Sequence, residues 1–393
     1  MKVLYYCKTI NSSHGGRTHA REFYAALKKV VGADSVHSYY ELEDINDENI
    51  SSENRHLRLW WLPFKLRTFL RLLIVNKNHT QEICKKLNEK ECDVLLLRHE
   101  TIRIDYKYIK ENHPNIKIAV ELNTIFANES FSNYIAKKII HNIEFKQFAT
   151  VDKIFPVSST LKQALIIGGI SANKITTNPN GVDLDRFNPG LMEDKIRFRN
   201  LYRIPTDKFV VGYVGGMEPY RRLPEFINQY LSIEKNIGEK LHLFVVGDGH
   251  DFTAIENKLK EGLDRGKFTL LGWQDHSDVP KIMATFDLSI MPYTLDYCSP
   301  LKLFEYLAMK LPTIGPDTIS VHELFEDGVD LFINKLGDSN NGGSIADQIC
   351  LLVEDTDKRV FIANNGYKKV VEGLTWEANA LRVVESIKDS GSC

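Results

Sequence analysis

The sequence predicts an α/β protein with two doubly wound domains. Short apolar runs that end in glycine or polar turns alternate with amphipathic stretches, which is typical of parallel sheets covered by helices. This pattern restarts after residue 200, and the stretch between the two halves, 178–190, is rich in Pro, Asn and Gly, as in a linker. The length of 393 residues also fits two or three domains of roughly 100–200 residues each.

In the first half, apolar runs predict strands and an amphipathic stretch predicts a helix at 18–30. The expected strands are residues 3–7, 93–97, 117–122 and 153–157. A second series of strands is expected in the other half, at 209–214, 241–246, 267–271, 288–291 and 313–314. Pro300 and Pro312 bound a further helix, because proline suits the first helical turn and interrupts a helix later.

These patterns predict a first domain over 1–178, a linker over 179–200, a second domain over 201–375 and a final helix over 376–393. An apolar stripe marks the final helix at Trp376, Ala380, Val383, Val384 and Ile387. Such a helix either caps the second domain or crosses back to the first, and the pattern leaves both arrangements open.

Composition and charge limit the kind of protein. Hydrophobic residues make up 43% and charged residues 26%, which excludes wholesale disorder, and a net charge of -2 argues against a nucleic-acid partner. The charge is uneven, since residues 1–180 carry 26 Lys and Arg against 19 Asp and Glu, whereas the rest carries 24 against 33. Neither a C-x-x-C pair, a signal peptide nor an 18-residue apolar window is present, so we expect a cytoplasmic protein with reduced thiols.

Two glycine-containing loops follow predicted strands and can bind an anion. Gly15 and Gly16 open the first helix, whose free amides favour negative charge, although a tight turn without a ligand fits them equally well. A second glycine turn is followed by Arg221 and Arg222. Guanidinium groups can clamp phosphate oxygens, and the alternative is a pair of solvated arginines.

The stretch 297–314 is the most informative segment. Its predicted helix starts near Pro300, so free first-turn amides could hold a diphosphate, with Lys302 adding positive charge. Glu305 follows in the second turn, where a carboxylate could bond both hydroxyls of a ribose. The alternative is an ordinary amphipathic helix with Glu305 exposed to solvent.

Four segments, in order along the chain, resemble the family 4 glycosyltransferases, which are retaining enzymes of the GT-B fold. They are Gly15-Gly16, Ser158 with the stretch 180–187, the stretch 245–249 with Leu271-Gly272-Trp273, and the segment 297–314. The resemblance covers nearly the whole chain and implies two Rossmann-like domains that face a central cleft. It also implies transfer of a sugar from a nucleoside diphosphate donor, for which we expect UDP rather than GDP, without a metal or other cofactor.

By position, the resemblance assigns most of the donor site to the second domain. Arg221 and Lys302 would hold the diphosphate and stabilise its departure, and Glu305 would bind the ribose. The other residues expected at the donor are Gly15, Gly16, Arg222, Gly247, Trp273, Gln274, Ser299, Pro300 and Leu301.

Two positions depart from the family's donor pattern. Tyr297 stands where the first Glu of the E-x7-E motif contacts the donor sugar. Gly216 stands where the phosphate clamp has an arginine, and Arg222 or Arg17 is a candidate substitute. The departure at Tyr297 puts the identity of the donor sugar in question.

The first domain is expected to supply the acceptor side. The family's catalytic-site histidine falls on Arg98, one residue before His99. Neighbours along a strand point to opposite faces, and we favour His99 as a loop residue that donates to the sugar. Arg17, Glu121 and Asn123 are further candidates on the acceptor side, with a helix cap and a solvated carboxylate as the alternative.

Two other segments are interpreted separately. Asp183-Leu184-Asp185 spells the D-x-D metal motif of another glycosyltransferase fold, but it follows a Pro-Asn-Gly turn, so we interpret it as structural. Residues 55–77 hold six Lys or Arg, no acidic residue, two Trp and two Phe, a pattern typical of a segment at an anionic membrane surface. The alternative is a helix packed on its own sheet with its arginines in solvent.

The sequence therefore favours a retaining glycosyltransferase that transfers a sugar to a glycan or lipid-linked acceptor in cell-surface polysaccharide or glycolipid assembly. We expect it in the cytoplasm, either free or bound peripherally to the cytoplasmic face of the membrane. Stabilisation of the departing diphosphate would be its main catalytic effect. Two alternatives stay open: a sugar-nucleotide epimerase of the same architecture, and a nucleotide-sugar-binding scaffold without catalysis, which Tyr297 and Gly216 favour.

Overall fold

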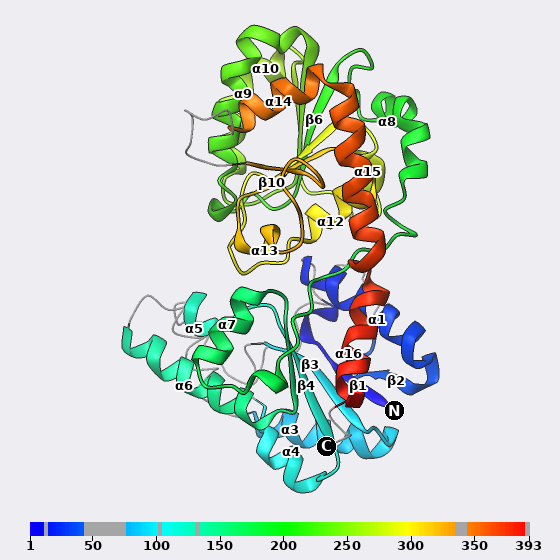
Figure 1. Ribbon diagram of the computed structural model, residues 1–393, viewed down its shortest axis with the longest axis vertical. Helices are drawn as coiled ribbons and strands as arrows, with labels where there is room; N and C mark the ends of the chain where they lie inside the picture. The colour runs from blue at the N-terminus through cyan, green and yellow to red at the C-terminus, as the bar shows by residue number, and fades with distance from the viewer. Residues whose placement is uncertain (12–14, 43–75, 101–103, 130–133, 335–343, 390–393) are drawn as a thin grey trace. The chain divides into compact units, whose positions relative to one another are not determined.

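The computed structural model consists of two compact α/β units (Figure 1). It describes the chain except for residues 12–14, 43–75, 101–103, 130–133, 335–343 and 390–393. Unit 1 comprises Met1–Asn180 and Trp376–Cys393, and unit 2 comprises Gly181–Thr375. Each unit has a parallel sheet with helices packed on it, so the predicted pair of doubly wound α/β domains is confirmed.

Unit 1 is built on a five-stranded parallel sheet in the order β2-β1-β3-β4-β5. Its strands are β1 (Val3–Tyr6), β2 (Val36–Ser38), β3 (Val94–Arg98), β4 (Lys117–Leu122) and β5 (Lys153–Pro156). The edge strand β2 is absent from the predicted set, because its three residues form no apolar run. The central strands are almost wholly buried, as expected for a parallel sheet covered on both faces.

The sheet of unit 1 is covered by α1 (Gly15–Val31), α3 (Lys77–Lys90), α4 (Tyr106–Asn112), α5 (Phe126–Glu129), α6 (Tyr134–Thr150), α7 (Ser159–Ile167) and α16 (Trp376–Asp389). Short 3-10 turns lie at Lys8–Asn11, Ala33–Ser35 and Ala172–Lys174. Of the basic segment 55–77, residues 55–75 lie outside the described residues. Within the described ranges, no helix has both the length and the apolar character needed to cross a membrane.

The last helix, α16, packs against α1 and belongs to unit 1. The Trp376 ring meets the His19 ring edge-on, with the ring centroids 4.8 Å apart, and its indole N–H donates to the Glu22 carboxylate. At the other end of α16, Lys117 Nζ donates to the carbonyl of Ile387 at 2.9 Å. Of the two arrangements left open by the sequence, the helix adopts the one that returns it to the first domain.

Unit 2 has a six-stranded parallel sheet in the order β11-β10-β9-β6-β7-β8. Its strands are β6 (Phe209–Val214), β7 (Leu241–Val246), β8 (Phe268–Leu271), β9 (Leu288–Ile290), β10 (Thr313–Pro316) and β11 (Phe332–Asn334). Its helices are α8 (Lys195–Leu201), α9 (Leu223–Ile237), α10 (Phe252–Asp264), α11 (Val279–Met283), α12 (Leu301–Ala308), α13 (Ile319–His322), α14 (Ile345–Glu354) and α15 (Thr356–Gly373), with 3-10 turns at Pro189–Asp194, Pro219–Arg221 and Gly238–Lys240.

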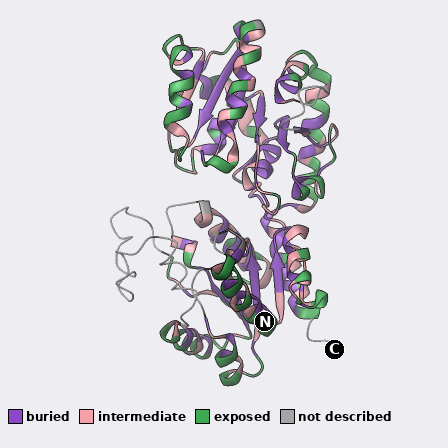
Figure 2. Ribbon diagram, turned by 90° about the vertical axis from the view of Figure 1, so that its left-hand side faces the viewer, coloured by how far each residue is buried: buried purple, intermediate pink, exposed green. Residues whose placement is uncertain are grey.

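Two apolar clusters form the core of unit 2, one on each face of its sheet. Val210 and Val214 belong to one cluster, whereas Val211 and Tyr213, which alternate with them along β6, belong to the other. Figure 2 shows these strands buried between helices whose outer faces are exposed.

Most of the predicted linker folds as part of unit 2. The backbone N–H of Val182 donates to the carbonyl of Leu374 at 3.0 Å, and Phe187 and Phe198 are buried in one of the two apolar clusters. The Asp183 carboxylate accepts the backbone N–H of Asp185 at 2.9 Å, so the D-x-D stretch closes a local turn.

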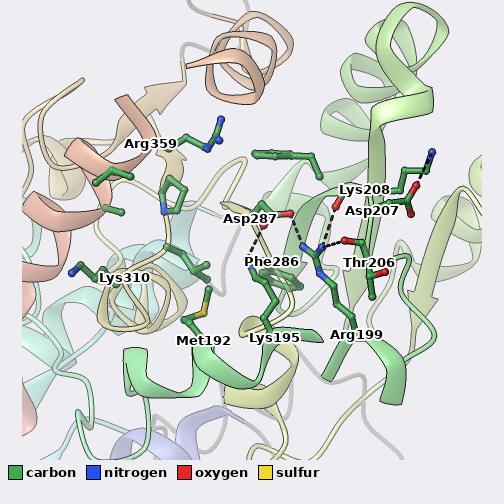
Figure 3. A pocket seen from close by; sticks show the side chains of 15 residues that line it. Met192, Lys195, Arg199, Thr206, Asp207, Lys208, Phe286, Asp287, Lys310 and Arg359 are labelled. Atoms are coloured by element: carbon green, nitrogen blue, oxygen red, sulfur yellow. Dashed lines mark hydrogen bonds and ion pairs between the residues drawn. The ribbon is translucent and has the colours of Figure 1, made fainter. Parts of the chain in front are cut away.

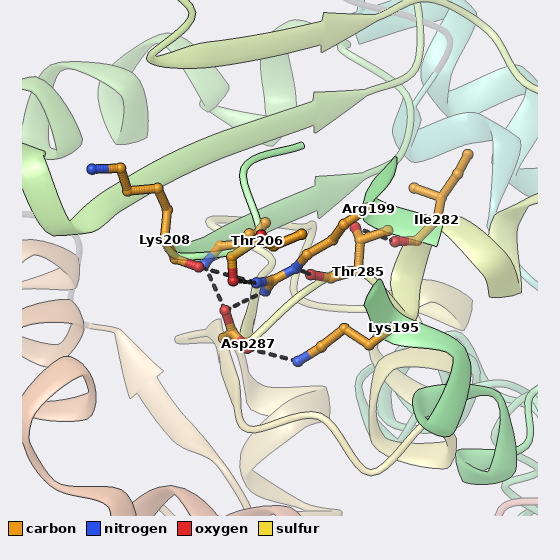
Figure 4. A network of polar contacts seen from close by, with 8 residues as sticks. Lys195, Arg199, Thr206, Lys208, Ile282, Thr285 and Asp287 are labelled. Atoms are coloured by element: carbon orange, nitrogen blue, oxygen red, sulfur yellow. Dashed lines mark hydrogen bonds and ion pairs between the residues drawn. The ribbon is translucent and has the colours of Figure 1, made fainter. Parts of the chain in front are cut away.

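A buried ionic network holds α8 against the amino ends of β6 and β9 (Figure 4). The Arg199 guanidinium donates to Asp287 Oδ2 at 2.5 Å and to the carbonyl of Thr285 at 3.0 Å. Asp287 also accepts Lys195 Nζ at 2.6 Å and the backbone N–H of Val210 at 2.7 Å. Burial alone would raise the pKa of the Asp287 carboxyl, but the charges of Lys195 and Arg199 outweigh it and lower that pKa.

Asp287→Asn is expected to lower the free energy of unfolding by about 3 kcal/mol, because Arg199 stays buried without its counter-charge. Since folding lowers the pKa of Asp287, its contribution is complete above the ordinary Asp pKa of about 3.9 and is lost as the pH falls below that value. Urea unfolding at pH 7 and pH 3 measures both effects, and the deficit of the variant should shrink at pH 3.

The matched control is Asp207→Asn, which changes an exposed carboxylate near the same network. It should alter stability by less than about 0.5 kcal/mol. An Asp287→Asn deficit that is equal at both pH values would contradict the role assigned to the ionised carboxylate.

Candidate functional site

The loops that follow β6 and β7 interlock at the carboxyl edge of the unit 2 sheet, the edge at which parallel α/β sheets bind ligands. The backbone N–H of Gly215 donates to the backbone carbonyl of Val246 at 3.0 Å. The backbone N–H of Met217 donates to the backbone carbonyl of Asp248 at 2.9 Å. Gly247 has a φ of +135°, and a Cβ at this position would lie 1.9 Å from the carbonyl oxygen of Gly215. The two loops therefore approach each other at a distance that only glycine allows at 247.

Arg221 is held at this edge by two loops. Its Nη1 donates at 3.0 Å to the hydroxyl of Thr294, which is buried in the loop after β9. Its guanidinium also lies over the Tyr220 ring, 4.9 Å from the centroid. Neither contact is to a carboxylate, so these partners leave the positive charge of Arg221 uncompensated.

The helix α12 starts at the same edge. Its first residue is Leu301, which follows the buried residues Ser299 and Pro300. Pro300 occupies the N-cap position and provides no side-chain hydrogen bond to the first-turn amides. Tyr297 lies half-buried in the loop that leads into the helix.

Glu305 on α12 is a buried carboxylate, only 3% exposed, with a partner on each oxygen. Lys302 Nζ donates to Oε2 at 2.6 Å, and His276 Nε2 lies 3.3 Å from Oε1. Burial alone would raise the pKa of Glu305, but the Lys302 charge and the His276 hydrogen bond outweigh it and lower that pKa. The alternative of a solvent-exposed Glu305 is therefore wrong.

Three other predicted donor residues lie on loops at this edge but have different surroundings. Arg222 adopts a left-handed conformation with φ of +52°, and its guanidinium pairs with Glu225 on α9. Trp273, in the loop after β8, is 66% exposed. Gln274 Nε2 donates to the carbonyl of Trp273 at 2.8 Å. Arg222, already paired with a carboxylate, is thus less suited than Arg221 to clamp a phosphate.

In unit 1, the glycine loop that opens α1 lies beside the end of β3. Arg98 Nη1 donates to the carbonyl of Gly16 at 3.2 Å. A Cβ on Gly16 would lie 3.3 Å from Cβ of Thr9, so this loop is also closely packed. Gly15 and Arg17 occupy the first turn of α1, where Arg17 is half-buried.

The expectation that His99 is a loop residue available to a sugar is not met. His99 does follow the end of β3, but its side chain is 6% exposed and its Nε2 lies 2.9 Å from the Glu144 carboxylate. The rings of Phe126 and Phe148 pack against it, with centroids 5.0 and 4.9 Å away. The buried Glu144 draws the imidazole into the core, and of the two neighbours it is Arg98 that contacts the glycine loop.

Glu121 belongs to a buried polar cluster and is neither a helix cap nor a solvated carboxylate. Its side chain accepts the Tyr5 hydroxyl at 3.0 Å, and its Oε1 lies 3.6 Å from His19 Nε2. Burial, reinforced by the charge of Arg98, lowers the pKa of His19. Asn123 follows β4 and is half-buried.

Sequence reasoning missed three residues of these clusters: His19, His276 and Thr294. His276 offered a detectable signal, since it is a titratable residue three positions after Trp273 in a loop at the carboxyl end of a strand. His19 and Thr294 offered none, because their roles depend on contacts with residues about 100 and 70 positions away.

A cavity of about 470 Å³ lies at the opposite, amino edge of the unit 2 sheet (Figure 3). Its wall contains Lys195, Arg199 and Asp287 from the ionic network, together with Arg359, which donates to the carbonyl of Val353 at 3.0 Å. Lys195, Arg199 and Arg359 donate to protein oxygens, and none of the predicted site residues lines the cavity. Among the residues that the structure describes, no group of three or more His, Cys, Asp or Glu is arranged to hold a metal ion.

The glycine contact between the two loops gives a direct test. Gly247→Ala is expected to lower the free energy of unfolding by about 2 kcal/mol or more, since it combines an unfavourable φ with a clash against backbone. Gly216→Ala is the matched control, because a Cβ there meets nothing within 4 Å, and it should stay within about 0.5 kcal/mol of the natural protein. Urea unfolding of both variants measures the difference, and equal stability would refute the close approach.

Comparison with known protein sequences places a family match in unit 2, since residues 208–355 match the family model "Glycosyl transferases group 1". The chain is 28% identical over 221 residues to UDP-Gal:alpha-D-GlcNAc-diphosphoundecaprenol alpha-1,3-galactosyltransferase of Escherichia coli, covering 55% of this chain and 53% of that protein. It is 24% identical over 256 residues to the capsular polysaccharide biosynthesis glycosyltransferase CapM of Staphylococcus aureus, covering 64% and 63%. The alignments thus span less than two thirds of these relatives' own lengths.

Solved structures resemble the chain over its whole length. Alr3699/HepE of Anabaena, in complex with UDP, aligns with a TM-score of 0.69 at 16% identity over 99% of this chain and 100% of that one. Sucrose-phosphate synthase of Thermosynechococcus elongatus aligns with a TM-score of 0.71 at 15% identity over 99% and 98%. The chain therefore has the GT-B fold, and residues 208–355 of its unit 2 match the group 1 glycosyl transferases.

Proposed function

We propose that the chain is a retaining, family 4 glycosyltransferase that transfers a sugar from a nucleoside diphosphate donor. The observation that carries this proposal is the buried, ionised Glu305 beside Lys302 at the start of α12, on the same edge of the sheet as Arg221 and the glycine loops. Such an edge offers cations and free amides for a diphosphate and a carboxylate for sugar hydroxyls. UDP is the proposed nucleotide, since one relative is named for a UDP-Gal donor and one structural neighbour holds UDP.

In the proposed mechanism, charge stabilisation at the leaving group supplies most of the rate enhancement. Arg221, Lys302 and the first-turn amides of α12 bind the diphosphate oxygens, on which negative charge grows as the glycosidic bond to the sugar breaks. The departing phosphate accepts the proton of the acceptor hydroxyl, so no protein base is assigned. These cations and amides replace a metal ion, and the donor is the only small molecule that the proposal requires.

The proposed acceptor is a glycan or lipid-linked sugar in cell-surface polysaccharide or glycolipid assembly. The names of the Escherichia coli and Staphylococcus aureus relatives support this class, because they refer to a diphosphoundecaprenol acceptor and to capsular polysaccharide. In unit 1, Arg17, Arg98 and Asn123 are the proposed acceptor-side residues. A nucleotide-sugar-binding scaffold is the second candidate, favoured by Tyr297 and Gly216 at positions where the family has Glu and Arg.

A peripheral position on the cytoplasmic face of a membrane is part of the proposal. On one side of α6, Tyr134, Ile135 and Ile139 are 75%, 67% and 39% exposed, next to the exposed cations Lys137 and Lys138. Apolar side chains flanked by lysines favour an interface with anionic lipids. The basic segment 55–77 would add to this attraction.

The donor site is tested by thermal shift with UDP, GDP, ADP and dTDP sugars, with and without EDTA, followed by analysis of the transfer products. UDP sugars should raise the melting temperature irrespective of EDTA. Arg221→Ala and Lys302→Ala should each lower kcat/KM by about 100-fold or more, since each removes a charge that stabilises the transition state.

Arg222→Ala is the matched control and should retain most of the activity, because the Arg222 charge is already paired with Glu225. Binding without any transfer product would favour the scaffold. No shift with any donor in folded protein would refute the donor site itself.

Membrane contact is tested by co-sedimentation with vesicles that contain phosphatidylglycerol. The double variant Ile135→Glu/Ile139→Glu should reduce the bound fraction by about tenfold at low vesicle concentration, because it removes two apolar side chains and adds like charge. Ile196→Glu, an equally exposed isoleucine on α8 of unit 2, is the control and should bind as the natural protein does. Unchanged binding of the double variant would exclude α6 from the interface.

A further inference from the structure

His276 lies in the loop between β8 and α11 and is not among the donor or acceptor residues predicted from the sequence. Its Nε2 is 3.3 Å from Oε1 of Glu305, while its Nδ1 is buried without a hydrogen-bond partner in the described structure. A carboxylate can only accept, so the contact requires the proton on Nε2. His276 therefore donates from Nε2 to Glu305, while its Nδ1 has no acceptor in the described structure.

The surroundings of His276 favour its neutral form, with Nδ1 unprotonated. Burial, together with the positive charges of Lys302 and Arg186, lowers the pKa of His276, whereas the Glu305 carboxylate opposes that change. Protonation would also create a buried N–H at Nδ1 without an acceptor, which is costly. The imidazole and the fully buried Phe187 ring make a T-shaped contact, with their centroids 5.7 Å apart. In the same loop, the Asp275 carboxylate accepts hydrogen bonds from the backbone N–H and the hydroxyl of Ser277.

The two partners of Glu305 leave it a defined binding capacity. An ionised carboxylate has about four lone-pair sites. Lys302 uses one on Oε2 and His276 uses one on Oε1, so about one remains on each oxygen. One free site on each oxygen is what the two adjacent hydroxyls of a ribose need.

Lys302 and His276, the two partners of Glu305, also differ in their other interactions. In the proposed function, Lys302 must serve the donor diphosphate as well as Glu305. In the described part of the chain, Glu305 is the carboxylate within hydrogen-bonding distance of His276, and the imidazole packs against Phe187 from the 181–187 stretch. His276 is thus the partner that can keep Glu305 in place while Lys302 interacts with the phosphates.

We propose that His276 is a positioning residue, which orients Glu305 so that both of its oxygens face the hydroxyls of the donor ribose. The inference rests on the proposed function, because it requires a nucleotide at this edge of unit 2. It assigns a purpose to Phe187 of the interdomain stretch, namely support for the imidazole.

The experiment compares UDP with 2′-deoxy-UDP by calorimetry. The natural protein should bind UDP about tenfold or more tightly than the deoxy form, because a hydrogen bond to a charged group is lost. Glu305→Gln and His276→Leu should both reduce this preference to about twofold or less. In the double variant, the loss of preference should be no larger than in either single variant, as for two residues that act on one contact.

Three controls separate positioning from general structural support. His276→Gln should restore most of the preference, because its amide can donate near the position of Nε2. His322→Leu removes an exposed histidine paired with Asp317 in the same unit and should leave the preference unchanged. In the protein without ligand, nitrogen NMR of the histidine rings should show a neutral Nε2–H tautomer for His276, and its signals should shift in Glu305→Gln.

The outcomes distinguish the inference from the function on which it rests. A folded His276→Leu variant with an undiminished preference for UDP would overturn the positioning role and leave the donor site standing. A natural protein that binds neither nucleotide would overturn the proposed function, and this inference with it. An Nδ1–H tautomer of His276, which leaves Nε2 without a proton, would refute the hydrogen bond to Glu305 directly.

Discussion

The arrangement of the carboxyl edge of unit 2 depends on a negative charge that is buried in the second turn of α12. Glu305 stays ionised at 3% exposure only because a cation and a neutral donor contact its two oxygens. The two partners of Glu305 come from different elements. Lys302 lies one turn earlier on α12, and His276 lies in the loop after β8. Phe187 packs against the His276 ring, with the ring centroids 5.7 Å apart.

At the same edge, the glycine-containing loops after β6 and β7 lie next to each other and form the candidate binding surface. Because β6 and β7 are neighbours in register, the loops after them leave the sheet side by side. Gly247 lets the second loop approach the carbonyl of Gly215, and Arg221 then reaches Thr294 from a fixed starting point. Because these contacts already constrain the loops, the charged side chains lose little conformational entropy when a ligand binds.

Much of this fold follows from sequence patterns. The strands β6 and β7 lie at the predicted residues, because continuous apolar runs closed by glycine have few other interpretations in an α/β chain. The short edge strands β2 and β11 escape prediction, since three residues carry no periodicity and depend on a neighbouring strand. The same holds for the candidate site. The proximity of Lys302 and Glu305 was predictable, because they are three residues apart on one helix. The buried position of His99 was not, because it depends on a contact with Glu144, 45 residues away.

The return of α16 to unit 1 has a consequence for the order of events during synthesis. Unit 2 is one continuous segment, whereas unit 1 needs Trp376 and the rest of α16 to cover α1. At the usual rates of translation, the apolar face of α1 around Phe23 waits ~20–70 s for the ribosome to make the residues between α1 and α16. Nascent unit 1 is therefore the part of this chain most in need of chaperones, even though it is translated first.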